Sequence, residues 1–500
     1  MKFLAVTTAL CALLTTGHCD AESNPSSSSS TQKVLPSDFT PPQVFKNLNL
    51  VRHTNLEKGY VRDTTNVVVE NIDSKPQDEY YIPFSSDVFD HVGGLEVRDK
   101  KAETEFKFDV KAVEYDAESS TQYFVAQFPE PLSPSAQLTL SISYYLLSTV
   151  EPVPATIKQD DKQYLSYGFS AYVPTAYHTE KQKTKIKFPN AEVREYTKTS
   201  GLTSGEDPEK QGNSIVYGPY DTSGLAPGVE QPVTVRYEFT KPIITASLLE
   251  RDLEVSHWGG NLATEERYWL RNDAADLADN FDRVSWTMKS YQGLPTAAVR
   301  ELKVLLSPGS VDPYFIDDIG NVSTSKFRPG QRREALLELK PRYPIFGGWK
   351  YSFKIGWNNE LSTFLRRLTG DSYILKVPFL EGPKMPEGIQ YERVDTRITL
   401  PEGATNVQYE IVGGTGMPLP GLVESELSLH KTFMDTVGRT VLKLSANNVA
   451  DEAREGELIV TYEYPFLAGF RKPLTIFAAL VAVFVTAWGV GQLDISIKKR

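Results

Sequence analysis

Cysteine is almost absent from this sequence of 500 residues. The two that occur, Cys11 and Cys19, both lie near the amino terminus. A disulfide framework is therefore excluded, and with only six histidines a dense soft-metal site is not expected either. We expect no metal and no cofactor. Stability must instead come from sizeable hydrophobic cores, and a chain of this length suggests two or three domains.

The common catalytic motifs are missing as well. We find no HExxH motif, no GxSxG nucleophile elbow, no P-loop and no GxGxxG fingerprint. Asp317 and Asp318 could hold a hard cation, but adjacent carboxylates in a turn are more often simply solvated. The sequence does not support catalysis, so we assign no catalytic, cofactor-binding or metal-binding residue.

Long basic runs are absent from the interior of the chain. Lys and Arg number 53 against 64 Asp and Glu, which gives a formal net charge of −11. Because phosphate binding needs a concentrated basic face, we expect no nucleic-acid partner.

The amino terminus is typical of a secretory signal. Lys2 is followed by an uncharged apolar stretch too short to span a bilayer, and Gly17 and Cys19 are small residues placed for cleavage before Asp20. We predict a signal peptide over residues 1–19. Both cysteines leave with it. Residues 20–40, which contain five consecutive serines, are expected to form a flexible leader.

The carboxyl terminus contains an uncharged apolar run at 474–493. Twenty residues of helix at about 1.5 Å each match the thickness of the hydrocarbon layer, so we predict a transmembrane helix over 473–493. A GPI-anchor signal is the alternative, but the basic end of the chain argues against it. With a cleaved signal, this predicts a type I protein with a short cytosolic tail, 494–500.

Between these ends, apolar and polar residues alternate with the period of a half-buried strand. Stretches at 105–112, 137–146, 233–240, 351–357 and 457–464 share this pattern. Lys241 and Pro242 follow the third of them. We therefore predict a mainly β protein with two tandem β-sandwich-like domains, 41–240 and 241–466, before the helix. No internal repeat is visible. The stretch at 297–308 fits a helix or a strand equally.

Three sequence stretches resemble the ribophorin I family. They are HWGGNLATEERYWL at 257–270, the long segment from DDIGNVSTS to PRYPIFGGWKYSFKIGWNN at 317–359, and FMDTVGRTVLKL at 433–444. The membrane entry RKPL at 471–474 fits too, and the resemblance covers essentially the whole chain. The short tail is similar to that of fungal members.

This resemblance implies a noncatalytic, membrane-anchored subunit of the eukaryotic oligosaccharyltransferase. Its expected partners are the catalytic multispanning subunit, other small membrane subunits and nascent polypeptide acceptors. Its expected location is the endoplasmic reticulum membrane, with the bulk of the chain in the lumen. Two alternatives stay open, a free-standing luminal lectin or chaperone for unfolded glycoproteins and a membrane-anchored luminal hydrolase.

Three residues are candidate sites. Asn321 begins the sequon Asn-Val-Ser in a polar, turn-like segment, so we predict an N-linked glycan there. Ala482 and Thr486 are small residues four positions apart in the apolar run. Because small residues allow helices to approach closely in lipid, we predict that they form a helix-docking face. The turns at His257 and Trp258 and at Phe346 to Trp349 are expected to be packed structural turns.

Overall fold

The computed structural model describes residues 33–34, 39–101, 107–114, 120–199, 202, 207–432 and 435–492. The predicted signal peptide with both cysteines, most of the predicted leader and the predicted tail lie outside the described residues. The described chain is mostly β-strand and ends in one long apolar helix, so the predicted mainly β class is confirmed. The described chain has two halves, each with its own large hydrophobic core. Residues of the first core lie between Phe45 and Ile243, and those of the second lie between Ile244 and Ala468.

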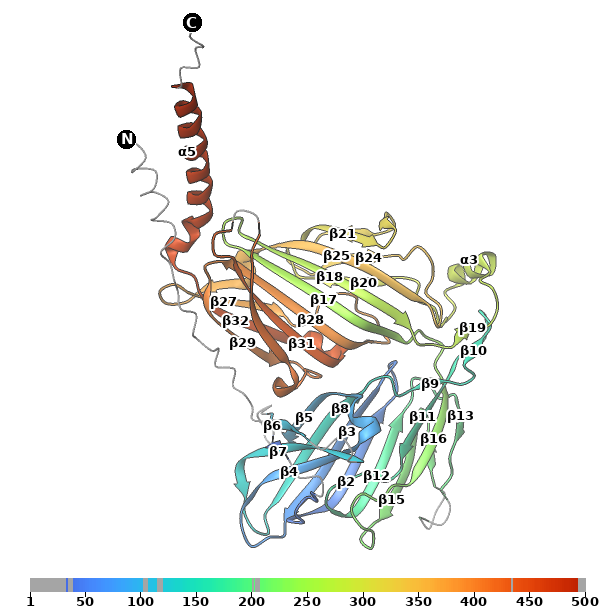
Figure 1. Ribbon diagram of the computed structural model, residues 1–500. Coiled ribbons are helices and arrows are strands. Elements are labelled where there is room, and N and C mark those ends of the chain that lie inside the picture. Colours follow the sequence, from blue (N-terminus) through green and yellow to red (C-terminus); the bar gives the residue numbers. More distant parts are fainter. Residues whose placement is uncertain are drawn as a thin grey trace, which may run out of the picture.

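A seven-stranded sheet forms the base of the first half of the chain (Figure 1). Its strand order is β14-β15-β12-β2-β3-β8-β5, and β2 and β12 pair in parallel while the other neighbours are antiparallel. The strands are β2 (Phe45–Asn55), β3 (Val61–Asn71), β5 (Val92–Asp99), β8 (Gln137–Leu146), β12 (His178–Lys187), β14 (Glu209–Gln211) and β15 (Ser214–Asp221).

Two smaller sheets share their core with this base. One has the order β1-β6-β7-β4, from β1 (Lys33–Val34), β4 (Gln77–Ser85), β6 (Asp109–Glu114) and β7 (Thr121–Leu132). The other has the order β13-β16-β11-β9, from β9 (Glu151–Pro152), β11 (Tyr164–Ser170), β13 (Val193–Tyr196) and β16 (Pro232–Glu238). The short helix α2 (Ser86–Phe89) follows β4. Aromatic and aliphatic side chains from all three sheets fill the common core.

The second half is built on an eight-stranded sheet with the order β22-β21-β25-β18-β17-β28-β31-β30. Its strands are β17 (Ile244–Ser256), β18 (Asn261–Asn272), β21 (Val311–Asp317), β22 (Gly320–Asn321), β25 (Lys350–Glu360), β28 (Ile389–Glu402), β30 (Glu424–His430) and β31 (Arg439–Ala450). Two smaller sheets accompany it, with the orders β20-β24-β23 and β26-β27-β32-β29. They consist of β20 (Leu302–Leu306), β23 (Lys326–Arg328), β24 (Ala335–Leu339), β26 (Leu365–Arg367), β27 (Ser372–Pro378), β29 (Thr405–Gly413) and β32 (Gly456–Glu463).

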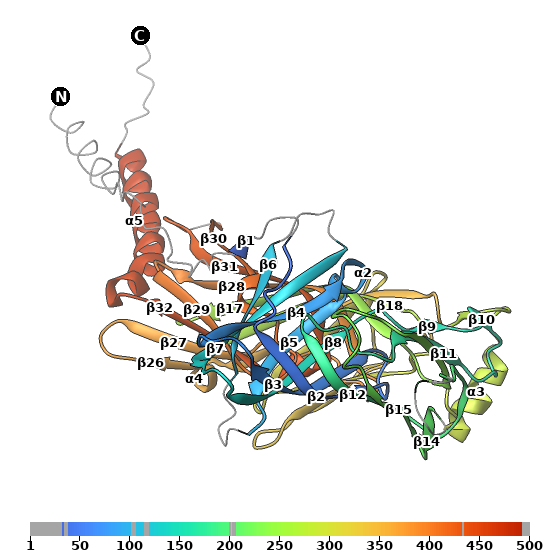
Figure 2. The same cartoon turned by 90° about the horizontal axis from the view of Figure 1, so that it is seen from below.

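The remaining elements of this half are short, apart from two helices. They are α3 (Arg283–Gln292), α4 (Leu361–Phe364), η1 (Pro420–Leu422), η2 (Asp451–Glu455), η3 (Phe466–Phe470) and α5 (Arg471–Gly491). Asp282 caps α3 by accepting from the backbone N–H groups of Val284 and Ser285, and Gly293 ends the helix in a left-handed conformation. Both views place α3 and α5 at opposite ends of the molecule (Figures 1 and 2).

The two halves have the same strand connectivity. Strands β2, β3, β8 and β5 pair in the order in which β17, β18, β25 and β21 pair, and β12, β15 and β14 correspond to β28, β31 and β30. The central parallel pair β2·β12 corresponds to β17·β28. The smaller sheets correspond as well, β4-β7-β6 to β20-β24-β23 and β9-β11-β16-β13 to β26-β27-β32-β29. The chain therefore contains two copies of one fold, an internal repeat that the sequence did not reveal. We call residues 45–238 repeat 1 and residues 244–463 repeat 2.

A bulge fixes the residue equivalence between the repeats. It falls between Asn47 and Asn49 on β2 and between Ala246 and Leu248 on β17. Counting from the bulge, Arg52 of repeat 1 corresponds to Arg251 of repeat 2, and both arginines are buried. Their neighbours on the parallel strand are Thr184 and Thr396.

An asparagine at the end of the second strand is equivalent in the two repeats too. Asn71 donates from Nδ2 to the carbonyls of Lys75 and Leu132, and its Oδ1 accepts from the N–H of Asp73. Asn272 likewise donates to two carbonyls and accepts from the N–H two residues later. Each asparagine therefore closes its strand end in the same way.

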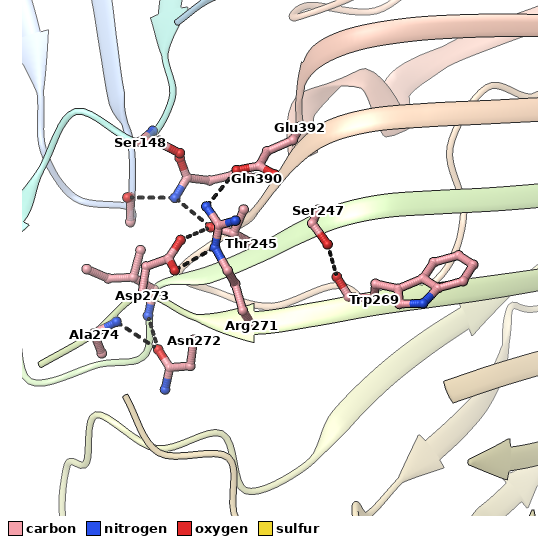
Figure 3. Close-up of polar contacts among 12 residues, drawn as sticks. Ser148, Thr245, Ser247, Trp269, Arg271, Asn272, Asp273, Ala274, Gln390 and Glu392 are labelled. Carbon is pink, nitrogen blue, oxygen red and sulfur yellow. Dashed lines mark hydrogen bonds and ion pairs between the residues drawn. The ribbon is translucent and has the colours of Figure 1, made fainter. Parts of the chain in front are cut away.

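The repeats are joined by buried polar contacts rather than by a free linker. Figure 3 shows Gln390 on β28, which accepts from the N–H of Ser148 at 2.6 Å and reaches Thr245 at 3.4 Å. Within repeat 2, Arg271 bridges Asp273 at 2.7 Å and Glu392 at 2.6 Å beside it. The bond between Ser148 and Gln390 connects the segment after β8 with β28 of repeat 2.

Close backbone approach reinforces this joint. A Cβ atom on Gly93 would stand 2.1 Å from the carbonyl oxygen of Asn448, in the other repeat. Nearby, Tyr60 and Lys58 both contact the carboxylate of Glu452, at 2.7 and 2.8 Å. A further parallel pair, β10 (Thr156–Ile157) with β19 (Asp276–Leu277), connects the repeats at a second point. The joint is therefore built to hold one relative orientation.

Candidate functional site at the foot of the apolar helix

Helix α5 is the one helix of the described residues that is long and apolar enough to cross a membrane. Its aliphatic, aromatic and alanine residues favour a helix in lipid, and a length of 21 residues corresponds to about 30 Å. Its side chains lie exposed and contact no other part of the described chain extensively. The helix leaves repeat 2 at the end of the molecule away from repeat 1 (Figure 1).

The start of the helix is tied to the turn between β17 and β18. Trp258 donates from Nε1 to the carbonyl of Gly469 at 2.8 Å, although its side chain is 72% exposed. The turn at His257 and Trp258 is present as predicted, but the expectation that its tryptophan is packed is wrong. The indole is held by one hydrogen bond beside the apolar helix. Its exposed ring can therefore face the membrane–water boundary.

The apolar residues of η3 lie beside this tryptophan. Phe466 and Leu467 are 73% and 79% exposed, and Phe470 stacks edge-on against Phe466 with ring centroids 5.0 Å apart. A tryptophan at such a position is typical of the membrane–water boundary, because its ring is apolar and its N–H is polar. We call Trp258, Phe466, Leu467 and Phe470 the helix foot.

His257 supports the foot from inside. Its ring contacts Tyr373 and Tyr464, with centroid distances of 4.9 and 4.6 Å, and its Nε2 lies 2.7 Å from the hydroxyl of Tyr462. Burial among these rings lowers the pKa of His257, because a charged imidazolium is poorly solvated there.

An ion pair fixes the first turn of α5. Lys472 lies 3.1 Å from Asp435, whose carboxylate also accepts from Thr432. Burial disfavours the charged form of Asp435, but the hydrogen bonds from Thr432 and the ammonium of Lys472 outweigh it and lower the pKa of Asp435 to about 2. The structure thus brings together two stretches, 433–444 and 471–474, that the sequence offered separately. Phe433 and Met434 of the first stretch lie outside the described residues.

Ala482 and Thr486 lie on one side of α5. The Thr486 hydroxyl donates to the carbonyl of Ala482 at 2.6 Å. Its hydrogen-bonding capacity is therefore partly used within the helix, and what this side offers a neighbouring helix is mainly its low bulk.

Asn321 lies far along the sheet, in the hairpin of β21 and β22. Asn321 and Ser323 are exposed, whereas Val322 between them is buried. Arg342 holds the hairpin by an ion pair to Asp317 at 2.5 Å and by donating to the carbonyls of Gly320 and Asn321.

Asp317 is committed to this structure. Burial acts against its charged form, but hydrogen bonds from Arg342 and from the N–H groups of Gly320 and Ile319 lower the pKa of Asp317. The expectation that the Asp317–Asp318 pair is merely solvated is therefore wrong for Asp317. In the described parts of the chain, no group of three or more His, Cys, Asp or Glu side chains is arranged to hold a metal ion.

Sequence reasoning did not identify the foot or the buried arginines. Trp258 was visible as part of a glycine-rich turn, but only the fold places that turn beside residues some two hundred positions later. Phe466 and Phe470 precede the apolar run and could have been noted as an aromatic boundary.

In the described residues, a β-rich body of two repeats carried on one apolar helix with an aromatic foot fits a single-pass membrane protein. The chain belongs to the ribophorin I family, whose family model matches residues 45–491. The resemblance seen in the sequence is confirmed.

Curated relatives agree along nearly the whole chain. Subunit 1 of the dolichyl-diphosphooligosaccharide–protein glycosyltransferase of Schizosaccharomyces pombe is 30% identical over 446 residues, which is 89% of this chain and 95% of the relative. Subunit 1B from Arabidopsis thaliana is 30% identical over 93% of this chain and 96% of its own length. Subunit 1 from Caenorhabditis elegans is 29% identical, over 91% of this chain and 73% of its own length.

Proposed function

We propose that this chain is a noncatalytic subunit of the oligosaccharyltransferase of the endoplasmic reticulum membrane. That complex transfers a preassembled oligosaccharide from dolichyl diphosphate to the asparagine of Asn-x-Ser/Thr acceptors. The observation that carries the proposal is the family match over 45–491, which includes both repeats and helix α5. The relatives that match this length are named as subunit 1 of such an enzyme.

A supporting role agrees with the geometry. A single membrane helix offers no enclosed lipid-facing groove for a dolichyl substrate. The most deeply buried charged cluster of repeat 2 is already paired, because Arg251 contacts Glu266 at 3.0 Å and Glu381 at 2.6 Å. Together with the fixed joint between the repeats, this favours a rigid arm that scaffolds the complex and offers a surface to acceptor chains.

The proposed topology places both repeats in the lumen and the carboxyl terminus in the cytosol. The predicted signal peptide supports this orientation, and the helix foot marks where the membrane boundary would fall, between the body and the helix. Protease treatment of sealed microsomes tests it. We expect the repeats to be protected from the protease. Digestion of the repeats in the absence of detergent would indicate the opposite orientation.

Purification in mild detergent tests subunit membership. We expect the chain to elute with the catalytic multispanning subunit and with other small membrane subunits. Elution as a monomer, with no multispanning partner, would instead support a free-standing lectin or chaperone for unfolded glycoproteins. Loss of a hydrolytic activity on depletion, with glycan occupancy unchanged, would support an enzyme.

Helix α5 is proposed to dock through Ala482 and Thr486. Replacing both with leucine adds bulk on that side and should reduce recovery of partner subunits without affecting insertion. Ala487→Leu is the matched control, because five residues turn it about 140° from Ala482 around the helix. Equal recovery in the double variant and the control would reject this docking face.

Asn321 is proposed to carry one N-linked glycan, which would make the chain a substrate of the complex it belongs to. The exposure of Asn321 and Ser323 in an ordered hairpin supports this. Endoglycosidase should shift the mature protein by the mass of one glycan, and Asn321→Gln should abolish that shift. Mobility unaffected by both treatments would show that the sequon is unused.

A further inference from the structure

Repeat 1 contains a cavity of about 430 Å³ between its base sheet and its two smaller sheets. Strands β2, β3 and β8 form the floor, β4 forms one wall, and β11 and β16 form the other. Most of the lining is aliphatic or aromatic, as in Leu50, Ile82, Ile142 and Val233. The volume lies within the range of small-molecule pockets and would hold one or two large side chains.

The floor of this cavity carries polar groups that are not fully used. Arg52, Asp63 and Thr65 are all more than nine-tenths buried and line the cavity. Within the described chain, Asp63 Oδ1 and Thr65 Oγ1 have no hydrogen-bond partner. An unpaired buried acceptor is costly, so a group that donates a hydrogen bond at this point would be bound favourably.

Repeat 2 shows how the same scaffold is closed. At the position of Thr65 it has Glu266, and at the position of Val67 it has Tyr268. Both of these residues are fully buried, and Tyr268 donates to Glu266 at 2.8 Å. Glu266 and Glu381 therefore pair with the guanidinium of Arg251, and Tyr268 joins this cluster through its hydrogen bond to Glu266.

The position that corresponds to Glu381 also has a smaller residue in repeat 1. The N–H of Ala171, just after β11, donates to Gln231, as the N–H of Phe379, just after β27, donates to Gly456. Two residues beyond these points stand Val173 and Glu381. Thr65, Val67 and Val173 all line the cavity. The cavity thus exists where repeat 1 has shorter residues than repeat 2.

Charge at the mouth restricts the ligand. Asp87 and Glu230 are exposed at the rim, and Asp63 balances Arg52 at the floor. An anion such as a lipid diphosphate would be repelled, whereas a neutral or cationic group would not. Serine, threonine and tyrosine hydroxyls also line the cavity, so a free glycan is the competing ligand in the test below. An apolar side chain with one donor at its tip matches both the walls and the floor.

We propose that this cavity binds a tyrosine or tryptophan side chain of an extended acceptor polypeptide, with its O–H or N–H donating to the hydroxyl of Thr65 at the floor. The inference rests on the proposed role in presenting acceptor chains. It gives repeat 1 the task of holding the chain and leaves repeat 2, closed by its own tyrosine, as the membrane-side support.

Fluorescent ten-residue peptides test the proposal with the purified complex in detergent. They share a Gly/Ser background, an Asn-Gly-Thr sequon and one variable residue, which is Tyr, Phe or Asp. We expect fluorescence polarisation to show the order Tyr, Phe, Asp, with Tyr about three- to tenfold tighter than Phe, the contribution of one hydrogen bond. A free high-mannose glycan is the competitor. Displacement of the peptide by this glycan would overturn the assignment to polypeptide.

Two variants locate the binding. Val67→Tyr copies repeat 2 and should fill the cavity, weakening the Tyr peptide at least about tenfold. Val68→Tyr places the same ring on the outer face of β3 and should bind as wild type. Thr65→Val keeps the shape but removes the hydroxyl, so it should reduce the Tyr-to-Phe ratio while leaving Phe binding unchanged.

The following results would contradict binding of the peptide in the cavity. Unchanged binding by a Val67→Tyr protein that melts as wild type would overturn the proposal, as would equal binding of all three peptides. So would a Tyr-to-Phe ratio that Thr65→Val leaves intact. If the chain purifies with its partners but no peptide binds, the cavity proposal fails and the subunit proposal stands. If the chain purifies as a monomer and binds the peptide, the subunit proposal fails and the cavity proposal stands.

Discussion

Arg251 on β17 and Glu266 on β18 face each other across the strand pair and form an ion pair with both side chains fully buried. Glu381 reaches the same guanidinium, at 2.6 Å, from the segment after β27. Two consecutive strands and a segment 130 positions further along the chain therefore meet at one arginine in the eight-stranded sheet of repeat 2.

Arg251→Met should be strongly destabilising. It leaves Glu266 and Glu381 without their cation, and removing one partner of a buried pair costs about 3–5 kcal/mol. Urea unfolding of the purified protein measures the change. Arg267→Met, at an exposed position on the neighbouring strand β18, is the control. A loss no larger than that of the control would mean that the pair is not needed for stability.

Much of this fold could be predicted from period-two alternation. Four of the five predicted stretches coincide with strands, namely β8, β16, β25 and β32, the fifth overlaps β6 from Asp109 onward, and the apolar run became α5. The ambiguous stretch at 297–308 became β20, because Leu302, Val304 and Leu306 point into the core between strands. Local pattern sufficed wherever one face of a strand is buried.

The internal repeat and both buried arginines could not be read from the sequence. Arg52 and Arg251 are flanked by different residues, and what they share is a register set by a bulge and a parallel neighbour. Helix α3 was missed although Asp282 and Gly293 are ordinary helix boundaries, since its exposed faces give no strong apolar period. Tertiary pairing, which no local pattern encodes, decides such features.

Gly93→Ala should loosen the joint between the repeats. The added methyl group would meet the carbonyl oxygen of Asn448, so the two repeats must separate slightly or strain. We expect a loss of about 1–3 kcal/mol, typical of overpacking, and faster proteolysis near the joint. Gly168→Ala is the matched control, because its Cβ meets nothing within 4 Å in the described structure. Similar behaviour of the two variants would mean that the joint tolerates movement.

The helix foot should weaken in mild acid. The folded-state pKa of His257 lies below its usual value of 6.5, so the unfolded chain binds more protons in the window between the two. The contribution of neutral His257 to the stability of the folded protein is complete above about pH 6.5, and it is lost as the pH falls through the lowered pKa. Melting temperature measured from about pH 7.5 to about pH 5.5 tests this. His257→Gln should remove that component, whereas the exposed His430→Gln should retain it. Identical profiles for all three proteins would contradict the assignment.

The hairpin that carries the sequon should depend on Arg342. Its ion pair with the buried Asp317 and its bonds to the carbonyls of Gly320 and Asn321 are the main links between the hairpin and the segment after β24. Arg342→Met removes all of them, so hydrogen exchange across residues 311–323 should accelerate by about ten- to a hundredfold, the equivalent of 1.4 kcal/mol for each factor of ten. Because the folded-state pKa of Asp317 is lowered, its contribution is present above its usual value of 3.8 and is lost as the pH falls below that. Arg328→Met, on the adjoining β23, is the control, since its side chain is exposed and its nearest carboxylate oxygen lies 3.6 Å away. Exchange that is equally slow in both variants would show that β21 alone holds the hairpin, and Asn321 would then owe its position to the sheet rather than to this arginine.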